Sequence, residues 1–163
     1  MDKKDAFITA LNQHQGLIYK IASIYTKSNE DRNDLSQEII YQLWKSFDSF
    51  DQRSGLSTWM YRVAMNVAIY HLKIARRRYP TLSLDEQFLN VQDVDYSELE
   101  ERWAVFRKHI DDLDLLNKGI IILYLENKSY EEIGQIIGIS TSNVGTKISR
   151  IKEKLKQQIQ KQQ

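Results

Sequence analysis

The sequence predicts an all-α protein made of two small helical domains. Proline occurs once and glycine six times among the 163 residues, so few residues interrupt helices. Apolar residues recur at spacings of three and four, which is typical of amphipathic helices, and no convincing alternating strand is present. The division into two domains follows from the distribution of charge along the chain.

The charges fall into three blocks that the overall net charge of +1 conceals. Residues 1–78 carry 12 Lys/Arg and 8 Asp/Glu, and residues 102–163 carry 11 and 7, so each block has a net charge of +4. Residues 79–101 carry 7 acidic residues and no Lys or Arg. Blocks of one sign mark interaction surfaces and tails. We therefore predict domains at 1–78 and 102–163, joined by an acidic linker at 79–101, with Pro80 ending the first helical region.

The composition argues against several classes of protein. The chain has no cysteine, which excludes disulfides, thiolate nucleophiles and cysteine-ligated zinc. The N-terminus lacks the apolar run of a signal peptide, and the longest apolar run, residues 119–125, is far shorter than the ~20 residues of a membrane span. The three histidines, His14, His71 and His109, show no metal-ligand or nucleophile–base spacing. We expect a cytoplasmic protein that is not an enzyme, has no cofactor or metal, and does not insert into a membrane.

The first domain is predicted to contain three amphipathic helices. The apolar stripe of the first consists of Phe7, Leu11, His14, Ile18, Ile21 and Tyr25. The second, residues 34–49, carries Leu35, Ile39, Leu43 and Phe47. The third begins at a cap, Ser57 or Thr58, and runs to about Arg77. Its buried face is predicted to be Met60, Val63, Ala64, Val67 and His71.

The second domain is predicted to end in a helix-turn-helix. Helical spacing resumes at Trp103, Phe106, Ile110 and Leu113, and an apolar helix follows at residues 118–125. Ser129 and Glu132 then form a capping box, and Gly138 stands where a left-handed C-terminal cap is needed. Ser140 can cap the last helix, whose inner stripe is Val144, Ile148, Ile151 and Leu155. Two helices joined by so short a turn have the layout of a helix-turn-helix.

The outer face of the last helix has side chains that suit DNA. It holds Ser142, Asn143, Thr146, Lys147 and Arg150, and four further lysines follow against a single acid, Glu153. Amides and hydroxyls can bind base edges, whereas Lys and Arg pair with phosphates. A basic helix alone is more often a solvated face. The cap, the glycine turn and the inner stripe together favour DNA binding.

The outer face of the third helix admits two interpretations. It holds Arg62, Asn66, Ile69 or Tyr70, and Lys73, and it ends in three consecutive arginines. A loop at residues 51–57 precedes it, and Trp59 and Tyr61 stand beside that loop. Cations with adjacent aromatic rings suit a single-stranded nucleic acid. Alternatively, the two aromatic residues belong to the core and the arginines complement the helix dipole.

An acidic motif opens the second helix. Asp31 and Asp34 favour the positive N-terminal end of a helix, which accounts for the acids. The helix dipole does not account for Tyr41 and Trp44, which are predicted to lie with Gln37 on the side away from the apolar stripe. An exposed aromatic pair beside carboxylates indicates a surface that docks a protein.

Two stretches of the sequence resemble a known family. Asp31, Asp34, Leu35, Gln37 and Glu38, followed by residues 47–50 and 57–68, resemble region two of bacterial sigma factors. Residues 129–134 and 143–151 resemble region four. Together, in this order and with this linker, they resemble the extracytoplasmic-function group of RNA polymerase sigma factors, which carry polymerase to promoters and help to open them.

The resemblance implies roles for individual residues. Core polymerase, through the clamp helices of its largest subunit, would bind Asp34, Gln37, Glu38, Tyr41 and Trp44. The minus-ten element would meet Ser46, Asp51, Gln52, Arg53, Ser54, Gly55, Leu56, Ser57, Trp59, Arg62, Val63, Asn66, Lys73, Arg76, Arg77 and Arg78, with the loop capturing a flipped base. The minus-thirty-five element would meet Ser142, Asn143, Thr146, Lys147, Ser149 and Arg150.

The resemblance also implies partners. These are core polymerase, including its flap, promoter DNA in duplex and single-stranded form, and an anti-sigma factor or other recruiting protein of the kind that family members often have. The alternative function is a helix-turn-helix regulator that is no polymerase subunit. That alternative explains residues 102–163 but not the tryptophan-containing motif around Trp59.

Overall fold

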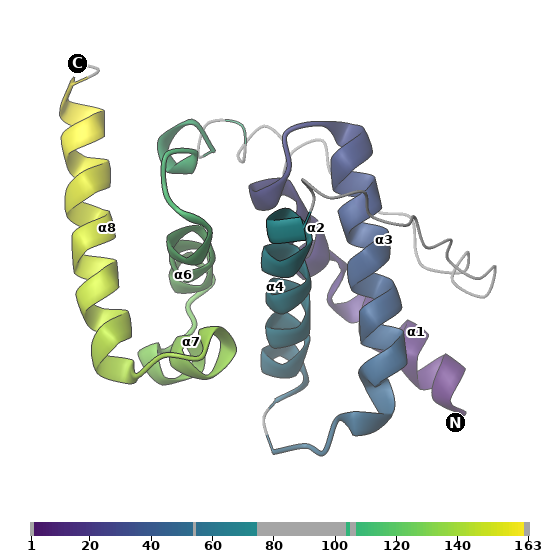
Figure 1. Ribbon diagram of the computed structural model, residues 1–163. Helices are drawn as coiled ribbons and strands as arrows, with labels where there is room; N and C mark the ends of the chain where they lie inside the picture. Colours follow the sequence, from purple (N-terminus) through teal and green to yellow (C-terminus); the bar gives the residue numbers. More distant parts are fainter. Residues whose placement is uncertain (1, 54, 75–103, 105–106, 162–163) are drawn as a thin grey trace. The chain divides into compact units, whose positions relative to one another are not determined.

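The computed structural model describes residues 2–53, 55–74, 104 and 107–161, and the side chains of residues 71–74 stand outside this description. Within these ranges every regular element is a helix, as predicted (Figure 1). The chain divides into two compact units, Met1–Asp95 and Tyr96–Gln163. The predicted acidic linker, residues 79–101, lies outside the described residues.

The first unit is built on three helices, α2 (Gln15–Tyr25), α3 (Asn29–Ser46) and α4 (Leu56–Ile74), which pack against one another (Figure 1). A shorter helix, α1 (Lys3–Gln13), adds Phe7 and Leu11 to their core, and a 3-10 turn, η1 (Phe47–Ser49), follows α3. The predicted stripe of α3 is buried at Leu35, Ile39 and Leu43. Burial of each such side chain contributes about 1.5–3 kcal/mol, so this stripe fixes which face of α3 remains outside.

The N-terminal apolar stripe belongs to two helices rather than the one predicted. The chain leaves the helical conformation at His14, where φ is −128° and ψ is 24°. The physical reason lies in α2, which is buried on nearly all sides and not along one stripe, with Leu17, Tyr19 and Ile24 as examples. A single straight helix over both segments could not place α2 in the core of the unit and also bring α1 into contact with α3.

The predicted bounds of α3 were wrong at both ends. The helix begins at Asn29 and not at residue 34, because Ser28 caps it: the Asp31 backbone N–H donates to the Ser28 Oγ at 3.0 Å. It ends at Ser46, and the chain tightens into η1 instead of continuing to residue 49. Serine three residues before an aspartate is a capping signal that the apolar stripe alone does not contain.

The buried face of α4 is rotated from the predicted one. Met60 and Ala64 are buried as predicted, but Val63 and Val67 are only half-buried. Their places in the core are taken by residues on the adjoining side of the helix, namely Trp59, Tyr61, Met65 and Ala68. The rotation arises because α4 contacts both α2 and α3, and the Tyr25 hydroxyl donates to the Met65 sulfur at 3.4 Å. The predicted core side chain His71 lies outside the described side chains.

The second unit consists of α6 (Leu115–Leu125), α7 (Tyr130–Ile137) and α8 (Thr141–Lys161), each in contact with the other two (Figure 1). α6 begins before the predicted residue 118, because Asp114 caps it by accepting from the Asn117 N–H at 2.8 Å. Ile110 and Leu113 are buried as expected, whereas Trp103 and Phe106 lie outside the described residues. None of the helices in the described ranges is long and apolar enough to span a membrane.

Candidate nucleic-acid interface

The helix-turn-helix of the second unit has the predicted local geometry. The Glu132 N–H donates to the Ser129 Oγ and the Ser129 N–H donates to the Glu132 Oε1, both at 3.1 Å, so the capping box is complete. Gly138 has a φ of +90°, in the left-handed region that favours glycine. At the start of α8, the Ser140 Oγ accepts from the Asn143 N–H at 3.1 Å. These predictions are confirmed.

The turn between α7 and α8 folds directly onto Gly134. The carbonyl of Gly134 accepts from the backbone N–H groups of Gly138, at 2.8 Å, and Ile139, at 3.1 Å. A Cβ at residue 134 would lie 2.7 Å from the Ile139 carbonyl oxygen, closer than a Cβ comes to a neighbouring atom in folded proteins. Glycine at this position therefore sets how near the turn comes to α7, and with it the direction in which α8 departs. The sequence signal is a glycine inside an amphipathic helix.

The two faces of α8 separate as predicted. Val144, Ile148 and Ile151 are buried, with Leu155 half-buried. The opposite face exposes most of the predicted DNA-binding residues, Ser142, Asn143, Thr146, Ser149 and Arg150, with Lys147 half-buried. The Thr146 hydroxyl donates to the Ser142 carbonyl at 3.2 Å, which leaves its oxygen as an acceptor. This face thus presents hydroxyls, an amide and cations together.

The outer face of α4 carries a second polar strip in the first unit. Asn66 and Tyr70 are exposed, and Ile69 is half-buried, so Tyr70 and not Ile69 belongs to this strip. Arg62 is half-buried, and its Nε makes no hydrogen bond to the described residues. Ser46 and Val63 are half-buried, and the Ser46 hydroxyl donates to the Gln42 carbonyl at 2.6 Å. The side chain of Lys73 and residues 76–78 lie outside the description.

The loop before α4 is held by its own side chains. The Asp51 carboxylate accepts from the Arg53 backbone N–H at 3.1 Å and pairs with the Arg53 Nε at 3.0 Å. Gln52 between them has a φ of 64°, in the left-handed region. At the far end, the Trp59 N–H donates to the Gly55 carbonyl at 3.0 Å. Asp51, Gln52, Arg53 and Gly55 are exposed, Leu56 and Ser57 are half-buried, and Ser54 lies outside the described residues.

Both ends of this loop rest on a cluster of aromatic rings. The Trp59 ring lies 5.3 Å from that of Phe50 and 6.2 Å from that of Phe47, between ring centroids. Phe47 contacts Phe7, at 5.3 Å, and Phe7 contacts Trp44, at 5.2 Å. Trp59 is only 8% exposed and Tyr61 is buried as well, so of the two interpretations of this aromatic pair the structure supports core packing. We refer to these five rings as the aromatic cluster.

The acidic face of α3 differs from the prediction in two side chains. Trp44 is half-buried, as Tyr41 is, because α1 covers part of it: Phe7 packs on its ring and the Lys3 Nζ lies 4.2 Å from its centroid. Glu38 is 6% exposed, with the Gln42 Nε2 donating to its Oε1 at 3.1 Å. The residues left at the surface of this face are Asp34 and Gln37, which are exposed, and Tyr41, which is half-buried.

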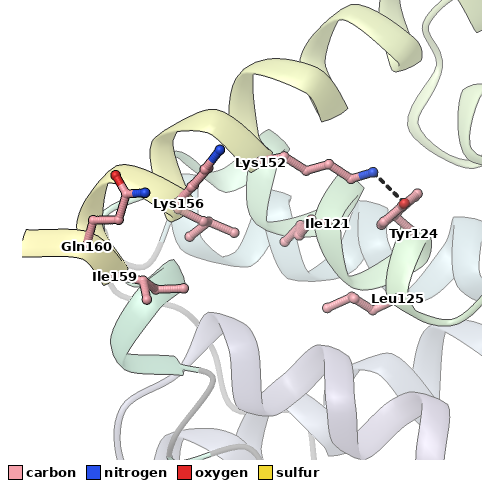
Figure 2. A pocket seen from close by; sticks show the side chains of 8 residues that line it. Ile121, Tyr124, Leu125, Lys152, Lys156, Ile159 and Gln160 are labelled. Atoms are coloured by element: carbon pink, nitrogen blue, oxygen red, sulfur yellow. Dashed lines mark hydrogen bonds between the residues drawn. The ribbon is translucent and has the colours of Figure 1, made fainter. Parts of the chain in front are cut away.

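A groove in the second unit contains none of the site residues that the sequence predicted. It has a volume of about 540 Å³ and lies between α6 and α8 (Figure 2). Leu125 and Ile159 line it and are 49% and 43% exposed, which is unusual for large apolar side chains. Lys152 stands at its edge, and its Nζ donates to the Tyr124 hydroxyl at 2.5 Å, which raises the pKa of Lys152 (Figure 2). The part of the chain that is described contains no cluster of metal-ligating residues.

Each of the two units matches a family of known proteins. Residues 10–78 match the family model of Sigma-70 region 2, and residues 100–155 match that of Sigma-70, region 4. The ECF RNA polymerase sigma-E factor of Haemophilus influenzae is 31% identical, covering 98% of this chain and 89% of the relative. The ECF RNA polymerase sigma factor SigW of Bacillus subtilis is 26% identical, with 96% and 90% covered.

Two solved structures have the same fold at low sequence identity. CnrH, in complex with the cytosolic domain of CnrY, has a TM-score of 0.71 at 18% identity, covering 98% of this chain and 90% of that chain. The sigma factor RpoE of Bartonella quintana, in complex with the anti-sigma factor NepR, has a TM-score of 0.66 at 18% identity, covering 95% and 97%.

Region 2 followed by region 4 defines a sigma-70-type transcription initiation factor. The chain belongs to the ECF group of RNA polymerase sigma factors.

The close approach at Gly134 generates a prediction with an internal control. Gly134→Ala should destabilise the α7–α8 pair by about 1–3 kcal/mol, because the added methyl group meets a backbone carbonyl that cannot move aside. Gly145→Ala should be neutral or stabilising by up to ~1 kcal/mol, since its Cβ meets only the Tyr130 ring at 3.5 Å and alanine favours a helix. Hydrogen exchange of the α7 and α8 amides measures both, and equal protection in the two variants would contradict the assignment.

Proposed function

We propose that this sigma factor binds core RNA polymerase, directs it to specific promoters, and stabilises the opened duplex at the minus-ten element. The observation that carries the proposal is that each unit buries one face of a long helix and presents a polar face on the other side, free of acids on α4 in region 2 and with Glu153 as its single acid on α8 in region 4. Two such faces on one chain fit a factor that contacts two promoter elements.

The face of α8 is proposed to bind the minus-thirty-five element as duplex. A helix-turn-helix inserts the N-terminal half of its second helix into the major groove. The exposed Asn143 and Thr146 lie in that half and suit base edges, and Arg150 and the half-buried Lys147 suit phosphates. Ser142 and Ser149 complete the proposed contact surface.

The face of α4 and its preceding loop are proposed to bind the minus-ten element as an unpaired strand. Asn66 would bind base edges together with Val63 and Ser46, and Arg62 would bind the backbone together with Lys73 and residues 76–78. The loop at residues 51–57 would hold a flipped base. Because Trp59 is buried in the aromatic cluster, we assign it the role of holding this loop in place rather than contacting DNA.

The polymerase clamp helices are proposed to dock on α3 through Asp34, Gln37 and Tyr41. These residues have spacings of three and four and share one face of the helix. Glu38 is buried and bonds to Gln42, and the half-buried Trp44 joins α3 to α1. We therefore assign Glu38 and Trp44 the role of holding the docking residues of α3 in position.

The groove between α6 and α8 is proposed to bind the polymerase flap. Its two exposed apolar side chains, Leu125 and Ile159, are the kind that anchor a partner helix by burial in a groove. Docking of region 2 on the clamp and of region 4 on the flap would strengthen each other, because the linker raises the effective concentration of the second contact.

The wider setting follows from these partners. The factor acts in the cytoplasm, where polymerase and chromosome are, and contributes no catalytic group of its own. An anti-sigma factor or another recruiting protein would control its access to polymerase. The neighbour RpoE is seen in complex with such a protein, the anti-sigma factor NepR.

Reconstitution with core polymerase tests the proposal. The purified chain should bind core polymerase and direct run-off transcription from discrete start sites on genomic DNA of its own organism. A helix-turn-helix regulator that is no polymerase subunit would bind duplex DNA without core polymerase and yield no such start sites.

Two sets of substitutions should separate docking from strand opening. Asp34→Ala with Gln37→Ala should lower the affinity for core polymerase about tenfold, because both exposed side chains lie on the proposed docking face. Asn66→Ala should leave that affinity unchanged and reduce open-complex formation by a similar factor. Fluorescence-detected core binding and permanganate footprinting measure the two activities. Equal loss of both activities in every variant would count against the division.

The groove gives a third discriminating variant. Leu125→Ser with Ile159→Ser should weaken core binding about tenfold, since both apolar side chains are about half exposed and their loss leaves no cavity in the core. Lys161→Ala, at the end of α8 and outside the groove lining, is the matched control. Retention of full core affinity by the double variant, with the α6–α8 pair still folded, would rule out this groove as a docking site.

A further inference from the structure

Tyr70 is the most exposed large hydrophobic side chain of the described residues, at 57%. It lies on α4, opposite the face that buries Ala64 and Ala68, and no role has been assigned to it above. An aromatic ring left in water forgoes the burial that most rings obtain in a folded chain. A partner with an apolar, flat surface would provide that burial.

The neighbours of Tyr70 indicate what that partner is. Arg62, Asn66 and Tyr70 follow at intervals of four residues, so they form one line along the helix. The line spans about 12 Å at 1.5 Å per residue. That length corresponds to roughly three to four nucleotides of a stacked strand at about 3.4 Å each. Arg62, Asn66 and Tyr70 thus present a cation, an amide and a ring along a length that a short run of nucleotides can match.

Along the sequence, the charge on either side of this line has one sign. Residues 52–84 contain six Lys or Arg and no Asp or Glu. A docking surface for a protein helix would ordinarily mix both signs, whereas a polyanion requires an unbroken positive field. An intact duplex offers groove edges and phosphates but no base faces to a ring on a helix surface. Unpaired bases offer their faces, and stacking on an exposed aromatic ring tolerates any base.

We propose that Tyr70 is a stacking platform for an unpaired base of the promoter strand that lies along α4, beyond the position bound by Asn66. The inference rests on the proposed function of α4 and adds to it a sequence-independent contact. The ring holds the strand after it separates, while Asn66 distinguishes among bases. Tyr70 therefore contributes to the stability of the opened strand and not to promoter choice.

Photocrosslinking in the assembled holoenzyme tests the inference. The probe is a pool of duplexes with a central unpaired segment of random sequence in which thymine is replaced by 5-iodouracil, a base that crosslinks to aromatic rings in contact with it. Wild-type holoenzyme should give a crosslinked peptide that contains Tyr70. Tyr70→Phe should retain the crosslink, and Tyr70→Leu, which keeps an apolar side chain but no ring, should lose it.

Affinity supplies the second measurement. Tyr70→Leu should lower the affinity of holoenzyme for the bubble pool about tenfold, as expected for loss of one stacked base, and Tyr70→Phe should change it less than twofold. Affinity for fully paired DNA and for core polymerase should not change in either variant. Because Tyr70 is exposed, neither substitution should disturb the fold.

The outcomes separate the inference from the function on which it rests. If wild-type holoenzyme binds bubbles no better than core polymerase does, the proposed function of α4 fails, and the role of Tyr70 fails with it. If wild-type holoenzyme binds bubbles well but the Tyr70 peptide is not crosslinked, or Tyr70→Leu binds them as well, only the stacking role is overturned. A loss of core affinity in Tyr70→Leu would assign the ring to a protein interface instead.

Discussion

The first unit depends on the aromatic cluster of Phe7, Trp44, Phe47, Phe50 and Trp59. Its ring contacts, at 5.2–6.2 Å between centroids, join α1, α3, η1, the loop and α4 in one continuous series. Aromatic pairs contribute about 0.5–1.5 kcal/mol each beyond the burial of their area, and they hold a defined geometry. The loop before α4 begins directly after Phe50, and α4 carries Trp59 in its first turn, so both ends of the loop are fixed to the same rings. The exposed residues between them are held in place without needing a core of their own.

The small size of the two cores explains why each unit keeps a surface for partners. Each unit has a thin core, and a helix that contributes to it must give one whole face to packing. In α4 and α8 the opposite face does not pack in the core, and the sequence places hydroxyls, amides and cations there. Some large apolar side chains nevertheless remain at the surface, among them Tyr70 on α4 and Leu125 and Ile159 at the groove. Partners are proposed to bind at these side chains, because binding would bury apolar surface that folding leaves exposed to water.

Local signals in the sequence predicted the second unit better than the first. The capping box at Ser129, the left-handed Gly138 and the stripe of α8 each depend on residues within a few positions, and all were confirmed. In the first unit, the break at His14, the rotation of α4, the burial of Glu38 and the partial covering of Trp44 depend on neighbours far along the chain. A helical stripe shows that a face is buried, but it does not show that a separate helix such as α1 will cover part of the opposite face. The groove escaped prediction for the same reason, because Leu125 and Ile159 become one surface only when α6 and α8 pack together.

The most direct measurement is the preference of holoenzyme for bubble over duplex DNA when Phe50 is replaced by leucine. Phe50→Leu keeps an apolar side chain but removes the ring contact with Trp59, and Phe50 itself is not among the residues proposed to touch DNA. If the aromatic cluster positions the loop, the bubble preference should fall about fivefold or more, while core affinity and duplex affinity stay the same. An unchanged bubble preference in a correctly folded variant would show that the loop is positioned by something other than these rings.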